Sequence, residues 1–212
     1  MKIRISFIFF CLILVQFSFA QNSYPFYKIS DESDILISAT ANSGYKYITV
    51  KITNNTNEEI LVKFPSGGFF NNSINSEQDL VNLFEKTLEV PSNGVNLITL
   101  STACADPKKA APRTGRTNWS FGFDQKIGIL LEKYHSNRSV VELMTGVENH
   151  SSSQKRHNFL QMFVWVYYNA DKKSILNFAT KYIFDGDRRA AEIFVDIYYP
   201  IAKLFIENYK RF

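Results

Sequence analysis

Hydrophobic and polar residues alternate along the first half of the chain with the two-residue period of β-strands. Residues 45–52 (YKYITVKI) alternate with this period and are rich in β-branched residues. The turn cluster at 54–57 separates them from a returning segment at 59–64, which predicts a hairpin. Further strands are predicted at residues 35–39, 80–90 and 95–102. Short strands at this spacing favour an immunoglobulin-like antiparallel β-sandwich over residues 21–102.

From Asp124 onward the hydrophobic period changes to 3.6 residues, which is typical of helices. Asp124 is a suitable N-cap for a helix that ends near His135. Residues 154–168 are apolar on nearly every side, so they predict a central buried helix, with a buried strand as the alternative. Two more helices are expected, at residues 172–184 and from Asp187 onward, with Pro200 kinking or splitting the last one.

Strands followed by helices indicate an α+β protein. We expect the helical half, residues 124–212, to share one hydrophobic core with the β half. The segment between them, residues 103–123, is predicted to be a basic loop or linker, because it has two prolines, two glycines and one acid, Asp106. Its four cations are Lys108, Lys109, Arg113 and Arg116.

Two interpretations of this loop stay open from the sequence. It is either a solvated linker or a loop that binds an anion or docks a partner. Trp119 and Phe121 follow the cations, and exposed aromatic rings beside guanidinium and amide groups bind sugars and peptide side chains. The alternative is that both rings pin the loop to the core.

The N-terminus has the three regions of a secretory signal peptide. Lys2 and Arg4 are the positive part, residues 5–17 are apolar but short for a membrane span, and Ser18 and Ala20 are the small residues before a cleavage site. We therefore expect cleavage after Ala20, a secreted or periplasmic protein, and no membrane span in the mature chain.

Charge and composition then exclude some classes of partner. Loss of residues 1–20 lowers the formal net charge from +4 to +2, which gives no reason to expect binding to nucleic acid. The three histidines, His135, His150 and His157, lack the spacing of a zinc site, so no metal and no cofactor are expected. The composition, rich in Ile, Lys, Asn and Phe, suggests a bacterial source.

The cysteines limit the chemistry further. Cys11 lies in the predicted signal peptide, so Cys104 is the only cysteine of the mature chain and an internal disulfide is excluded. A single thiol outside the cytoplasm is buried and inert, paired with another molecule, or used chemically.

The chain resembles two groups of proteins. The first is an uncharacterised group of secreted bacterial proteins, which the chain resembles in the order of three features. These are a β-sandwich, then Cys104 with residues 111–115 (APRTG) after it, then a helix near Gln161. Residues 160–165 (LQMFVW) resemble the ΦQΦΦΦW motif of the thioester-domain adhesins of bacterial surfaces. That second resemblance implies that the thiol of Cys104 and the acyl group of Gln161 condense to an internal thioester that captures host amines.

The sequence thus favours a non-catalytic interaction or adhesion module for an unknown protein or glycan partner. Its predicted contact residues are Lys108, Lys109, Arg113, Arg116, Trp119 and Phe121. The alternative is covalent chemistry at Cys104, either a thioester with Gln161 or an enzyme reaction with a histidine as partner.

Overall fold

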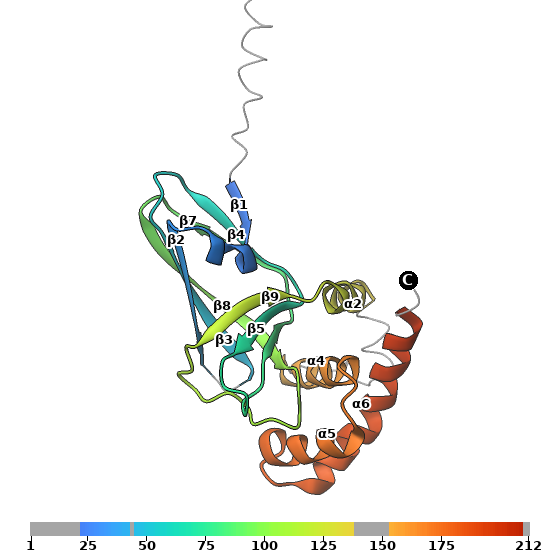
Figure 1. The fold of residues 1–212 in the computed structure, drawn as a ribbon. Helices are drawn as coiled ribbons and strands as arrows, with labels where there is room; N and C mark the ends of the chain where they lie inside the picture. The colour runs from blue at the N-terminus through green and yellow to red at the C-terminus, as the bar shows by residue number, and fades with distance from the viewer. Residues whose placement is uncertain (1–21, 43–44, 138–152, 210–212) are drawn as a thin grey trace, which may run out of the picture.

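The computed structural model describes residues 22–42, 45–137 and 153–209, so the predicted signal peptide lies outside the described residues. Within these ranges the chain is a mixed α+β protein with nine strands in two sheets and four α-helices. Figure 1 shows the strands gathered in one part of the molecule and α2, α4, α5 and α6 packed along one side of it.

The larger sheet contains strands that the alternating pattern predicts, β2, β3, β6 and β8, and two that it does not predict, β5 and β9. Its six strands follow the spatial order β2-β3-β8-β6-β5-β9, and every neighbouring pair is antiparallel. The bounds are β2 Ile35–Ala41, β3 Tyr47–Asn54, β5 Gly68–Asn72, β6 Leu80–Asn82, β8 Gly94–Cys104 and β9 Trp119–Phe123.

The smaller sheet differs from the sequence prediction in two ways. It contains β1 (Asn22–Pro25), β4 (Ile60–Phe64) and β7 (Lys86–Val90) in the order β1-β4-β7, and β1 runs parallel to β4. The sheet is therefore not purely antiparallel. The hairpin prediction for β4 is wrong as well, because β4 pairs with β1 and β7 and not with β3.

Residues 80–90 form two strands, β6 and β7, where the pattern predicts one. The side-chain amide of Asn82, which is fully buried, donates to the carbonyls of Phe64, Pro65 and Phe84 at 2.8–3.1 Å. These bonds hold the chain where it leaves the larger sheet for the smaller one. Residues 80–90 form one continuous run of strand-forming residues, so the sequence gives no sign of such a crossing.

The helices follow their predicted positions closely. Asp124 caps α2 by accepting from the N–H groups of Lys126 and Ile127. After it come α4, α5 with a π-helical turn η2, and α6, which continues through Pro200 without a break. Their bounds are α2 Gln125–Ser136, α4 Ser153–Tyr167, α5 Lys172–Phe178, η2 Ala179–Ile183 and α6 Arg188–Tyr209; a 3-10 turn η1 covers Phe26–Asp31.

Helix α4 is the central helix that the sequence predicts. Its residues from Phe159 to Trp165 are at most 2% exposed, and it packs against β8 on one side and α6 on another. Buried residues of both the strands and the helices belong to one hydrophobic cluster. No helix among the described residues is long and apolar enough to cross a membrane.

Candidate functional site

Cys104 and Gln161 meet at the contact between the larger sheet and α4. Cys104 is the last residue of β8, and Gln161 lies in the middle of α4. The N–H of Cys104 donates to Gln161 Oε1 at 2.8 Å, and Gln161 Nε2 donates to the carbonyl of Cys104 at 2.8 Å. Two hydrogen bonds between one side chain and the backbone of one residue thus join positions that are 57 residues apart.

The strand end explains why Cys104 needs this partner. Cys104 is opposite Leu80 in the last pair between β6 and β8, and the next N–H, that of Ala105, bonds to the carbonyl of Asp79. Both Cys104 and Gln161 are fully buried, and a buried peptide group without a partner costs about 1–3 kcal/mol. The Gln161 amide therefore stabilises the fold, because it is the hydrogen-bond partner of the buried N–H and C=O groups of Cys104.

The surroundings of Cys104 keep its thiol protonated. Burial raises the pKa of the thiol well above its ordinary value, and the nearby Asp79 carboxylate raises it further. A thiolate is the reactive form of cysteine, so this environment does not favour a cysteine enzyme that turns over a diffusing substrate. It is compatible with a reaction in which the acceptor group is already held beside the thiol.

Two further buried polar side chains lie near this contact: Tyr45, which was not predicted to be part of a site, and His157, one of the three histidines considered as partners of Cys104. Tyr45 is 5% exposed and His157 is 8% exposed, and their rings lie 5.8 Å apart. Tyr45 Oη and His157 Nε2 have no hydrogen-bond partner in the part of the chain that the structure describes. The available signal was the helical spacing, since His157 precedes Gln161 by one turn of α4.

The basic loop is fixed to the body of the protein by buried side chains. Gln78 is fully buried, donates to the carbonyl of Lys109 at 3.0 Å, and accepts from the N–H of Asp106 at 2.9 Å. Near the other end of the loop, the N–H of Gly115 donates to the carbonyl of Ala41 at 2.7 Å. The loop ends earlier than predicted, because Trp119 already begins β9.

Three of the four loop cations have acidic partners among the residues that the structure describes. Glu77 is 5% exposed and receives two hydrogen bonds from Arg116, at 2.9 and 2.8 Å, while Arg113 lies 3.7 Å from the same carboxylate. Lys108 forms an exposed ion pair with Asp171 at 3.4 Å. Arg116 is therefore part of the structure of the loop, and Lys109 and Arg113 are the cations most available to a partner.

The two aromatic residues predicted to bind a partner pack on the core. Trp119 is half-buried, donates from Nε1 to the carbonyl of Arg116 at 3.0 Å, and lies edge-on to Phe70. Phe121 contacts the rings of Phe26 and Phe70. These contacts match the alternative interpretation, in which the rings pin the loop. Binding of a partner at this loop stays a prediction.

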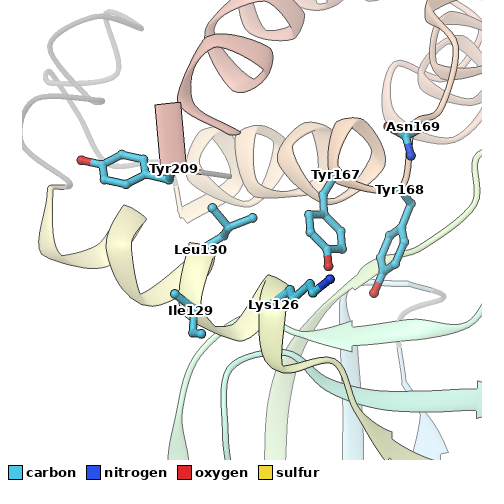
Figure 2. A pocket seen from close by; sticks show the side chains of 7 residues that line it. All are labelled: Lys126, Ile129, Leu130, Tyr167, Tyr168, Asn169 and Tyr209. Carbon is cyan, nitrogen blue, oxygen red and sulfur yellow. The ribbon is translucent and has the colours of Figure 1, made fainter. Parts of the chain in front are cut away.

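A separate cavity of about 550 Å³ lies between α2 and the ends of α4 and α6. Figure 2 shows Tyr167 and Tyr168 reaching from the end of α4 toward Lys126 on α2. Both phenols donate to the Asp124 carboxylate, at 3.1 and 3.0 Å, and burial together with that carboxylate raises the pKa of Tyr167 to about 12. The N-cap of α2 thus also ties α2 to α4, and no residue predicted as a site lines this cavity.

Comparison with models of known protein families, with curated proteins and with solved structures gives no match. The function of this chain is therefore inferred from the geometry of this site.

Proposed function

We propose that this protein is an exported adhesion module that attaches covalently to an amine-bearing partner through a thioester between Cys104 and Gln161. The observation that carries the proposal is the pair of hydrogen bonds between the Gln161 amide and the backbone of Cys104. The resemblance of residues 160–165 to the thioester-adhesin motif names these same two residues.

The condensation needs only groups that are present. The sulfur of Cys104 bonds to the amide carbon of Gln161, the C–N bond of the amide breaks, and the thiol proton leaves with the nitrogen as ammonia. No oxidant or reductant is involved. Holding the two groups together in one fold supplies the high effective concentration that such an acyl transfer requires.

The hydrogen bond to Gln161 Oε1 also has a chemical role in this proposal. Negative charge develops on that oxygen when the sulfur attacks, and the N–H of Cys104 already donates to it at 2.8 Å. A donor directed at the developing charge in a buried site is a common source of catalysis in acyl transfer. Burial also keeps water from the thioester, which lengthens its lifetime.

The reverse reaction gives the adhesion function. A primary amine attacks the acyl carbon, an amide bond forms to Gln161, and the thiol of Cys104 is released. This chemistry selects a protein partner with an accessible lysine. Since both residues are buried, the amine reaches the bond only when α4 and β8 separate locally, and we expect slow capture of a small amine by the native protein.

Methylamine tests this proposal. We expect the exported protein to incorporate one methylamine per chain, located on Gln161 by mass spectrometry of peptides, and to expose one new thiol at the same time. Cys104→Ala is the matched control, because it removes the sulfur while the backbone bonds to Gln161 remain. Equal labelling of that variant, or no labelling of the wild-type chain, contradicts the proposal.

We further propose that residues 1–20 direct export and that the two sheets form an immunoglobulin-like sandwich. The signal-peptide pattern of the N-terminus supports the first statement. The predominance of antiparallel pairs supports the second, whereas the parallel β1–β4 pair departs from that architecture.

A further inference from the structure

Helix α6 presents apolar side chains to solvent as well as to the core. Figure 1 shows α6 at the outer edge of the molecule, with α4 between it and the strands. On its outer side, Ile193, Ile197 and Leu204 are 54%, 45% and 50% exposed, and Pro200 between them is exposed too. The side that packs on the rest of the protein consists of the buried residues Ala191, Phe194, Val195, Ala202 and Ile206.

The four outer residues form one apolar stripe. Ile193, Ile197, Pro200 and Leu204 follow one another at spacings of four, three and four positions. At 3.6 residues per turn, these positions fall within an arc of about 60° on the helix surface. Such spacing is typical of the seam along which one helix packs on another. Single exposed hydrophobic residues are ordinary on a protein surface, whereas a contiguous row indicates an interaction site.

Charges of alternating sign follow one flank of this stripe. They lie within an arc of about 40° on the helix surface and are all exposed. In chain order they are Arg189, Asp196, Lys203 and Glu207. Within the chain, Asp196 pairs with Lys172 at 2.9 Å and Lys203 with Glu207 at 3.8 Å. Exposed pairs of this kind contribute little to stability, so these side chains are available to a partner.

This order of charges is complementary to itself when a second copy of α6 runs in the opposite direction. A twofold axis through the middle of the stripe sets Arg189 opposite Glu207 of the second copy, and Asp196 opposite Lys203 of the second copy. Each opposed pair then occurs twice. Two parallel copies would instead set every charge beside its own equivalent, where like charges repel. The charges therefore favour a second copy in the antiparallel direction.

The apolar stripe fits the same axis. It sets Ile193 opposite Leu204 of the second copy and Ile197 opposite Pro200 of the second copy. The two charged pairs and the two apolar pairs are all centred between residues 198 and 200. One arrangement thus covers the apolar side chains and pairs the charges beside them.

We propose that two copies of this chain associate through α6, in an antiparallel helix pair that covers the stripe of Ile193, Ile197, Pro200 and Leu204. One helix from each copy makes a small interface, so we expect a reversible dimer with a dissociation constant in the micromolar range. This inference does not depend on the thioester. A dimer of an adhesion module engages a surface at two points, which strengthens attachment without any new contact.

Sedimentation equilibrium of the exported protein over a range of micromolar concentrations tests the apolar part of this interface. We expect wild type to change from monomer to dimer as its concentration rises. Ile197→Gln should weaken the dimer about a hundredfold, because the apolar contact is lost in both copies. Leu36→Thr is the matched control. It removes another exposed apolar side chain, 57% exposed on β2, and should leave the dissociation constant unchanged.

Charge reversal tests the antiparallel direction. Asp196→Lys alone, or Lys203→Asp alone, sets like charges opposite each other twice and should weaken the dimer about tenfold. The two changes combined in one chain restore opposite charges and should restore the dimer. An equal mixture of the two single variants should also associate, because each variant then supplies the charges that the other lacks.

A wild-type chain that is monomeric at every concentration overturns this inference, as does a dimer that neither Ile197→Gln nor the charge reversals weaken. Binding of monomeric wild type to phosphatidylcholine vesicles, lost in Ile197→Gln, would assign the stripe to a lipid surface and overturn it as well. The variants should melt like wild type at low concentration, because the changed side chains are exposed. If Ile197→Gln melts early, Leu204→Gln takes its place. Methylamine uptake does not require association, so the two proposals can fail separately.

Discussion

Replacing Gln161 with leucine in a Cys104→Ala background lowers the free energy of unfolding by about 4 kcal/mol. The alanine background removes any thioester, so the measurement reports the fold alone. Leucine fills a similar volume but can neither accept from the N–H of residue 104 nor donate to its carbonyl. Both groups are then buried without a partner, and each costs about 1–3 kcal/mol.

Urea unfolding followed by circular dichroism measures this difference. Cys104→Ala alone is the reference, and Gln161→Glu in the same background is the matched variant, because glutamate can still accept from the N–H but has no amide to donate. We expect the glutamate variant to be destabilised as well, since it buries a charge. A loss below about 1 kcal/mol for leucine would mean that the α4–β8 contact is not formed as described.

Replacing Arg116 with serine lowers the melting temperature by about 8 °C. Its guanidinium donates twice to Glu77, and the loss of that partner leaves a carboxylate that is 5% exposed with Asn72 and the more distant Arg113. Removing the main partner of a buried charge is among the most destabilising changes in proteins. Differential scanning calorimetry gives the shift directly.

Arg113→Ser and Lys109→Ser are the controls for this result. Arg113 is 86% exposed at the side chain and 3.7 Å from the same carboxylate, so its loss should move the melting temperature little. If all three serine variants melt alike, the loop is solvated and Glu77 is not held by Arg116. If only Arg116→Ser melts early, later binding studies of the loop should use Lys109 and Arg113.

The ion pair between Arg116 and Glu77 also makes the stability of the fold depend on pH. The hydrogen bonds from Arg116 hold the pKa of Glu77 below its ordinary value, so the folded state binds the proton less readily than the unfolded state. The resulting stability is present above the unfolded pKa and is lost as the pH falls through the folded pKa. We expect the free energy of unfolding of Arg116→Ser to change less with pH, between the unfolded and folded pKa values of Glu77, than that of the wild type.

Helices were easier to predict from this sequence than strand partners. The 3.6-residue period and the Asp124 cap located α2 within a residue, because both signals are local. The partner of β4 and the division of residues 80–90 depend on which sheet a strand joins, and alternation carries no such information. Strand β5 is not among the predicted strands, because paired glycines are more typical of a turn than of a strand, and here Gly67, with a φ of +82°, turns the chain into β5.

The site shows the same division between local and distant information. Cys104 and Gln161 were paired through a six-residue motif, and the structure brings them into contact. Tyr45 was not selected, and His157 was considered only as one of three possible histidine partners of Cys104, since nothing in the sequence shows which buried hydroxyl or imidazole will lack a partner. The loop cations were identified as a group, but their acid, Glu77, lies far earlier in the chain and was not connected with them.

The intact mass of the exported, untreated protein is the most direct test of the central claim. The proposed thioester predicts a mass that is lower by one ammonia than that of residues 21–212, and this deficit should be absent in Cys104→Ala and in Gln161→Leu. A wild-type mass equal to that of the uncondensed chain, with Cys104 recovered as a free thiol after denaturation, would contradict the claim and leave Gln161 as a structural partner of the β8 backbone.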